Sequence, residues 1–156
     1  MPDKPLAYLL TFTCYGTWLH GDDRGAVDFE HNKYGAKFVP PSPVRKTVRR
    51  EQMNDEPVIF DQHERELVEN TIREVCQYRQ WKLQAVNVRS NHIHAIAAGN
   101  HDPDKIMSDF KAYATRKLRE SDPKYKDRKV WTEGGSTRYL WDEESVITAC
   151  GYVRNQ

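Results

Sequence analysis

The chain has 156 residues, of which 38% are hydrophobic and 30% are charged, and its formal net charge is +1. These values are typical of a globular domain with its own core, and they leave little room for a second one. No apolar run reaches the roughly 18 residues of a membrane helix, and the start of the chain lacks a signal-peptide pattern, so we expect a cytoplasmic protein without a membrane partner.

The first part of the chain predicts one strand and a long connection. Leu6 to Tyr15 is rich in aromatic, β-branched and leucine residues, which favours a buried strand. Glycines and prolines then recur with little periodicity, which predicts a loop insertion at about 16–57 within a single domain, 1–156. Cysteine spacing indicates neither a disulfide framework nor a zinc site, so we expect three small buried side chains: Cys14, Cys76 and Cys150.

The rest of the chain alternates helical and extended patterns. Asp61 and Glu64 have the spacing of a capping box, which predicts a helix running to about Gln80. Pro103 suits the first turn of a second helix, which the Asp-Pro pair at 122–123 ends. The remaining predicted elements are strands at 82–89, 92–97, 130–131 and 138–141, and a last helix from Asp142 with Val146, Ile147, Cys150 and Val153 as its buried face.

The order of these elements predicts the fold class. Strand, helix, strand, strand, helix and strand match an α+β, ferredoxin-like or RNA-recognition-like antiparallel sheet with helices on one face. The last helix is then an addition to this fold.

Two histidines are candidates for a metal site. Side chains alternate along a strand, so His92 and His94 project to one face and could share a divalent cation completed by oxygen ligands and water. Two half-exposed histidines on a sheet face are the alternative.

A tyrosine lies away from the expected buried face of the last helix. Tyr152 and Gln156 are one turn apart, so they would present a phenol and an amide oxygen side by side. A phenol titrates near 10 and needs a partner to act as a nucleophile, which a metal at the histidines could provide by polarising a phosphodiester. The alternative is that Tyr152 only packs against its neighbours.

Several stretches together resemble a known family. The chain is similar to the small single-tyrosine HUH transposases of the insertion-sequence-200 type, and particularly to their REP-associated tyrosine transposase branch. The stretches are FTCYGTWLHGDDRG, VRSNHIHAI, KAYATRKLRE, GSTRYLW and GYVRNQ.

The resemblance implies an enzyme and assigns its site. It implies Tyr152 as the nucleophile, His92, His94 and Gln156 as metal ligands, and Mg²⁺ or Mn²⁺ as the metal. The implied reaction cleaves single-stranded DNA near REP-like or transposon-end hairpins, leaves a 5′-phosphotyrosine and a free 3′-hydroxyl, and rejoins strands. Because Gln156 is the last residue, where a helix frays, it is the weakest of these ligands.

Basic side chains are candidates for DNA contacts, since cations bind the phosphates of a single strand. A catalytically inactive single-strand binding protein of the same fold is one alternative function, and a phosphodiesterase that uses water is another. The sequence leaves open whether the protein is a homodimer and whether Tyr152 serves its own histidines. The candidate DNA contacts are Arg45, Arg49, Arg50, Lys111, Arg116, Arg138 and Arg154.

Overall fold

The computed structural model describes residues 4–17 and 56–156. The predicted loop insertion therefore lies almost entirely outside the described residues. In chain order, the elements are β1 (Ala7–Thr13), α2 (Gln62–Arg79), β2 (Lys82–Val88), β3 (His92–Ala98), α3 (Pro103–Ser121), the short 3₁₀ helix η1 (Pro123–Tyr125), β4 (Ser136–Leu140) and α4 (Glu143–Arg154).

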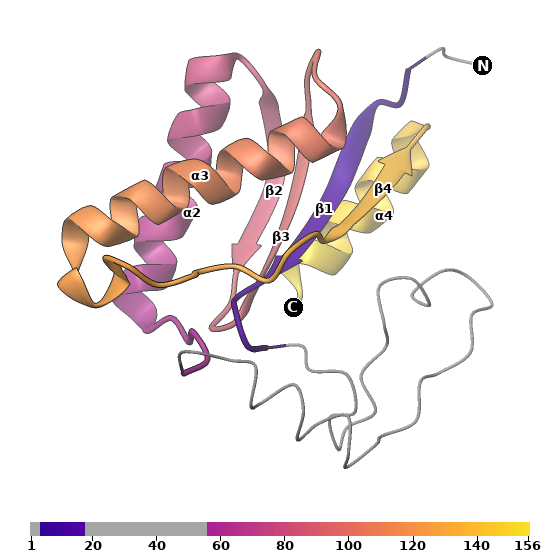
Figure 1. Ribbon diagram of the computed structural model, residues 1–156. Coiled ribbons are helices and arrows are strands. Elements are labelled where there is room, and N and C mark those ends of the chain that lie inside the picture. Colours follow the sequence, from indigo (N-terminus) through magenta and orange to yellow (C-terminus); the bar gives the residue numbers. More distant parts are fainter. Residues whose placement is uncertain (1–3, 18–55) are drawn as a thin grey trace.

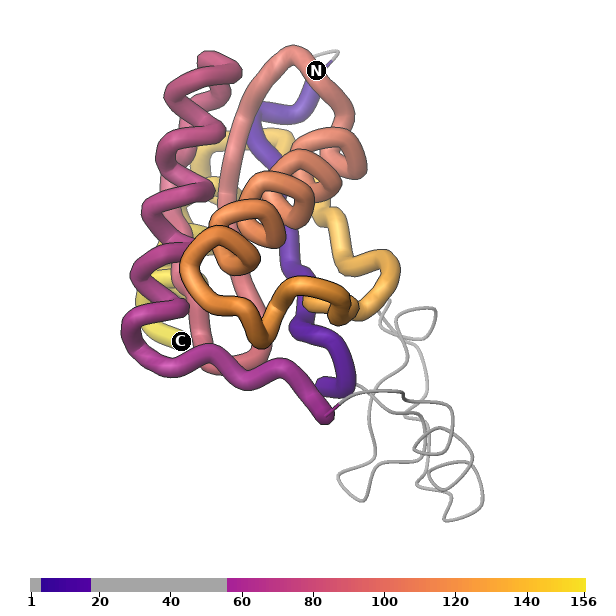
Figure 2. The backbone as a smooth tube through the Cα atoms, turned by 60° about the vertical axis from the view of Figure 1, so that its left-hand side comes forward, coloured from indigo at the N-terminus to yellow at the C-terminus, as the bar shows by residue number. Residues whose placement is uncertain are grey.

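The four strands form one antiparallel sheet in the order β2-β3-β1-β4. Helices α2 and α3 cover one face, and α4 lies behind the other (Figure 1). The turned view in Figure 2 keeps the same order of layers, with the C-terminal helix behind the sheet. The α+β class and the antiparallel sheet are thus confirmed.

Alternation along the strands creates a separate core on each face of the sheet. Leu10 and Phe12 of β1 are fully buried in the larger core beneath α2 and α3. The smaller core joins α4 to the other face, where Ile96 of β3 meets the helix. Since side chains two apart share a face, His92 and His94 lie on the same side of the sheet as α4. The smaller core consists of Ala7, Ala85, Ile96, Leu140, Val146, Cys150 and Val153.

Capping side chains define where the helices begin. The Asp61 carboxylate accepts a hydrogen bond from the Glu64 backbone at 2.8 Å, and the Glu64 carboxylate accepts one from the Asp61 backbone at 2.9 Å. This reciprocal pair confirms the predicted capping box of α2. Asp102 caps α3 directly before Pro103, which also confirms the predicted start of that helix.

Two local predictions were wrong. Residues 130–131 form no strand, and Trp131 makes only an isolated bridge to Cys14. The Trp131 ring instead packs in the larger core against Phe12, with ring centroids 5.2 Å apart. Ile147 was expected on the buried face of the last helix but is 71% exposed, because α4 rests on the sheet along the narrower stripe of Val146, Cys150 and Val153.

The predicted state of the cysteines is confirmed. Cys14, Cys76 and Cys150 are all buried and free. Across residues 4–17 and 56–156, no helix is long and apolar enough to cross a membrane.

Candidate active site

The two histidines of β3 stand next to each other on the α4 face of the sheet. Their ring centroids are 5.0 Å apart and the ring planes are inclined by 78°. His94 is buried, with 7% of its surface exposed, whereas His92 is half-buried. The period of the strand therefore places both imidazoles at one location, as predicted.

A neighbouring side chain holds each imidazole. Nδ1 of His92 lies 2.9 Å from Oδ1 of Asn91, and because that oxygen can only accept, Nδ1 donates. The lone pair of His92 is then on Nε2. Nδ1 of His94 lies 2.9 Å from the hydroxyl of Thr11, which is its partner in the β1–β3 register. Both rings thus engage Nδ1 and leave Nε2 for another ligand.

Both imidazoles favour the neutral form. Burial lowers the pKa of His94 to about 4, and the charges of His92 and Arg89 act in the same direction. Burial, followed by the charge of Arg89, also lowers the pKa of His92. Neutral rings keep the lone pairs that a metal ion requires, so the two side chains fit a cation site without first losing a proton near neutral pH.

Tyr152 approaches the pair from α4. Its ring centroid is 5.7 Å from that of His94, and the two ring planes are inclined by 72°. The tyrosine is 53% exposed, so its phenol is accessible to a large ligand. Histidines and tyrosine of one chain therefore share a site, although 58 to 60 positions separate them in the sequence.

Gln156 lies near this group but its side chain is turned elsewhere. The side-chain amide donates to the backbone carbonyl of Tyr152 at 3.4 Å. The backbone carbonyl of Gln156 accepts from Arg89 at 2.6 Å, which fastens the chain end to the sheet. In the described part of the protein, the side-chain amide of Gln156 thus contacts the tyrosine helix rather than an imidazole.

The donor set suits a cation whose remaining ligands are oxygens. Among residues 4–17 and 56–156, no group of three His, Cys, Asp or Glu side chains comes together. Two neutral imidazoles would therefore need water, phosphate or amide oxygens to complete a metal site. The buried hydroxyl of Thr13, which is the cross-strand partner of His92, has no hydrogen-bond partner in the described ranges.

A pocket extends from this site between β4 and α4. We call it the β4–α4 pocket; its volume is about 630 Å³, which lies within the range of ligand sites. His94 and Tyr152 belong to its lining, and the apolar side chains of Leu9 and Leu140 form part of its surface. The pocket therefore adjoins the candidate active site.

The predicted DNA contacts are spread over both faces. Arg138 lines the β4–α4 pocket, and Arg154 on α4 donates to the Gln84 carbonyl at 3.3 Å. Lys111 and Arg116 lie on α3, on the opposite face of the sheet from the histidines. Arg45, Arg49 and Arg50 lie outside the described residues.

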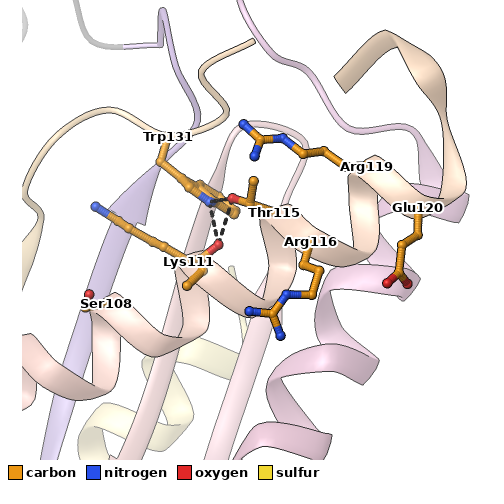
Figure 3. Close-up of a pocket in the computed structure, with 8 residues that line it drawn as sticks. Ser108, Lys111, Thr115, Arg116, Arg119, Glu120 and Trp131 are labelled. Carbon is orange, nitrogen blue, oxygen red and sulfur yellow. Dashed lines mark hydrogen bonds between the residues drawn. The ribbon is translucent and has the colours of Figure 1, made fainter. Parts of the chain in front are cut away.

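A groove on α3 contains two of these cations, next to Trp131 (Figure 3). The Lys111 ammonium donates to the carbonyls of Thr132 at 3.1 Å and Gly134 at 2.6 Å, so two of its three donors are engaged. The Arg116 guanidinium lies 5.1 Å from the centre of the Tyr113 ring. These cations therefore have structural contacts as well as exposure to solvent.

The sequence reasoning missed Thr11 and Asn91, which hold the imidazoles. Asn91 lies between the predicted strands 82–89 and 92–97, and Thr11 was predicted only as part of a buried strand. A signal was present for Thr11, because Thr11 and Thr13 are polar side chains two apart in an otherwise apolar strand, and such a pair marks a shared face. No local pattern indicates which histidine each residue would meet.

The fold resembles those of solved transposase structures. The first is a candidate transposase from Deinococcus radiodurans R1, with a TM-score of 0.52 and 12% identity, covering 99% of this chain and 93% of that one. The second is a REP-associated tyrosine transposase bound to a REP hairpin, with a TM-score of 0.53 and 12% identity. That match covers 96% of this chain, which spans 65% of the other protein. At these identities the likeness shows a shared fold.

The family follows from the sequence match. Residues 49–156, more than half of the chain, match the family described as "Transposase IS200 like", and the chain belongs to that family. The resemblance seen in the sequence is thereby confirmed. None of the curated proteins compared with the chain matches it.

Proposed function

We propose that this protein cleaves and rejoins single-stranded DNA in a metal-dependent reaction, with Tyr152 as the nucleophile. The observation that carries the proposal is the 5.7 Å separation of the Tyr152 and His94 rings, at a site where the His92 ring is 5.0 Å from that of His94. A solvent-accessible phenol next to a pair of imidazoles that could hold a metal ion suits phosphodiester attack by tyrosine, because a phenol needs such a partner to act as a nucleophile. Membership of a transposase family supports DNA as the substrate.

The reaction conserves the energy of the broken bond. The phenol oxygen of Tyr152 attacks the phosphorus, the bond from phosphorus to the 3′ oxygen breaks, and the phenol proton ends on the departing 3′ hydroxyl. The 5′ side of the DNA is then held as a phosphotyrosine. Attack by a 3′ hydroxyl reverses these changes and joins strands, so no nucleotide cofactor is consumed.

His92 and His94 would hold Mg²⁺ or Mn²⁺ through Nε2, and Gln156 is a third candidate ligand. The ion, when bound, would neutralise charge on a non-bridging phosphate oxygen. Asn91 and Thr11 keep the imidazoles oriented for this task. For Gln156 to contribute, its amide has to leave the Tyr152 carbonyl and turn toward the histidines.

His92, His94 and Tyr152 of one chain lie together at the proposed site. Tyr152 lies beside His94 of the same chain, which supports attack by the tyrosine on a phosphate held at its own histidines. The likeness to a transposase bound to a REP hairpin supports hairpin-bearing DNA as the substrate class.

The test is the formation of a covalent adduct. The protein is incubated with a pool of single-stranded DNA hairpins and Mg²⁺ or Mn²⁺, and denaturing electrophoresis is used to detect protein linked to DNA. We expect an adduct with the unaltered protein, none with Tyr152→Phe, and a strong reduction with His92→Ala or His94→Ala. Tyr78→Phe is the matched control, because Tyr78 is also exposed but lies on α2, across the sheet from the site.

Two experimental outcomes would contradict this proposal and indicate a different function. Salt-sensitive DNA binding that survives Tyr152→Phe, with no cleavage by any protein, would identify a binding protein of the same fold. Cleavage that persists in Tyr152→Phe but disappears in His92→Ala would identify a phosphodiesterase that uses water.

A further inference from the structure

The β4–α4 pocket runs along one face of α4, starting at Tyr152. Along α4, Glu144, Thr148 and Tyr152 are spaced four residues apart, so they lie on one face of the helix and span about 12 Å. Tyr152 is next to His94, and Glu144 is two turns away. The pocket thus leads away from the candidate active site over about the length of one or two nucleotides.

The opposite wall of the pocket comes from β4 and β1. Arg138 of β4 pairs with Leu9 of β1, two positions from Thr11, which binds His94. Strand β1 therefore lies between Arg138 on β4 and the histidines on β3, and all three strands contribute to the same face of the sheet. Leu9 and Leu140 add apolar side chains to the lining, and ligand pockets typically combine such side chains with a few polar groups.

Two charged groups of opposite sign are available in this pocket. Arg138 and Glu144 are exposed, and within residues 4–17 and 56–156 neither forms an ion pair. Asp142 is already engaged, since its carboxylate caps α4 by accepting from the Ser145 backbone at 2.8 Å. Glu144 is therefore the pocket carboxylate with both oxygens free of hydrogen bonds within the described ranges.

A carboxylate would repel a DNA phosphate, but it accepts hydrogen bonds from amino groups on bases. A guanidinium donates to base acceptors or to the neighbouring phosphate. Cytosine, adenine and guanine each carry an exocyclic amino group with two N–H donors beside acceptor atoms, whereas thymine offers the carboxylate only a single ring N3–H. The charge pair in the pocket thus matches the three amino-bearing bases better than it matches thymine.

We propose that the β4–α4 pocket binds one unpaired base next to the scissile phosphate and selects a base that carries an exocyclic amino group. Glu144 accepts from the amino group, and Arg138 donates to acceptor atoms of the same nucleotide. This inference rests on the proposed function, because it takes the phosphate at His92, His94 and Tyr152 as the point from which the strand enters the pocket.

A binding selection tests the pocket without requiring cleavage. Hairpin DNA with randomised single-stranded flanks is mixed with the full chain, and the bound fraction is sequenced. At one flank position we expect amino-bearing bases to be enriched over thymine roughly fivefold or more, the lower end of what a good base contact contributes. Glu144→Gln should abolish this enrichment, since an amide both donates and accepts. Glu143→Gln, the same change at the exposed neighbour outside the pocket, should preserve it.

The result separates the two proposals. Bound DNA without any positional preference would overturn the base pocket, as would a preference that survives Glu144→Gln or is lost equally in Glu143→Gln. Failure of the adduct assay together with a Glu144-dependent preference would instead remove the cleavage reaction and leave the base pocket in place.

Discussion

The hydroxyl of Thr11 lies 2.9 Å from Nδ1 of His94, across the ladder between β1 and β3. This contact fixes the ring that lies between His92 and Tyr152. The orientation of the candidate metal site therefore depends on a residue more than 80 positions away in the chain.

Thr11→Val should weaken metal binding, because valine has nearly the same shape but cannot bond to His94. We expect the affinity for Mn²⁺, measured by calorimetric titration, to fall roughly 10- to 100-fold, as for other residues that orient a metal ligand. Thr137→Val is the matched control, since Thr137 pairs with Leu10 and so lies on the other face of the sheet. Equal affinities for the two variants would show that Thr11 does not orient the site.

Tyr125→Phe should destabilise the fold beneath α2. The Tyr125 hydroxyl donates to the buried carboxylate of Glu64, which also completes the α2 capping box. Removing the hydroxyl should lower the free energy of unfolding by about 1–3 kcal/mol, because a buried acceptor loses a partner. Urea unfolding measures this change. Tyr113→Phe, at a half-buried tyrosine whose hydroxyl makes no bond in the described ranges, should change the same quantity by less than about 0.5 kcal/mol.

Alkaline pH should destabilise the protein partly through Cys76. Burial raises the pKa of this thiol to about 12, whereas the thiol of an unfolded chain titrates near about 8.5. Between these pH values the unfolded state releases a proton that the folded state keeps. The stabilisation is therefore complete below the unfolded pKa and is lost as pH rises through the folded pKa.

Replacing Cys76 should reduce this pH dependence. Cys76→Ala costs packing at every pH, but its free energy of unfolding should decline less between about pH 8 and about pH 10, by about 1–2 kcal/mol. Val75→Ala is the control for a buried truncation without an ionisable group, and it should retain the dependence of the unaltered protein. Parallel curves for all three proteins would exclude a contribution from Cys76.

Gly135→Ala should be more destabilising than Gly134→Ala. Both glycines have positive φ values, 78° at Gly134 and 155° at Gly135, so alanine is strained at either position. At Gly135 the added Cβ would also lie 2.7 Å from the backbone oxygen of Thr11, whereas nothing lies within 4 Å at Gly134. We expect an additional loss of about 1–3 kcal/mol at Gly135, measured by thermal unfolding. Similar losses at both positions would indicate that the turn opens away from β1.

Local sequence patterns were sufficient to predict most of the fold and part of the candidate active site. The capping box at Asp61 and Glu64, and the alternation around His92 and His94, act over a few residues, so the sequence encodes them directly. The same holds for the start of α3 at Asp102 and Pro103. Ile147 and Trp131 were placed wrongly because their surroundings depend on which distant element covers them.

By itself, the sequence determined that two imidazoles share a face and that Tyr152 lies off the buried stripe of its helix. Only the tertiary structure decided that α4 covers the histidine face, that Thr11 holds His94, and that Arg138 and Glu144 line one pocket. The physical reason is the range of the interactions. The alternation of side chains along a strand and the capping of a helix depend on neighbouring residues. The position of α4 depends instead on burying its apolar side chains against the sheet, which selects one packing from several that the local pattern permits.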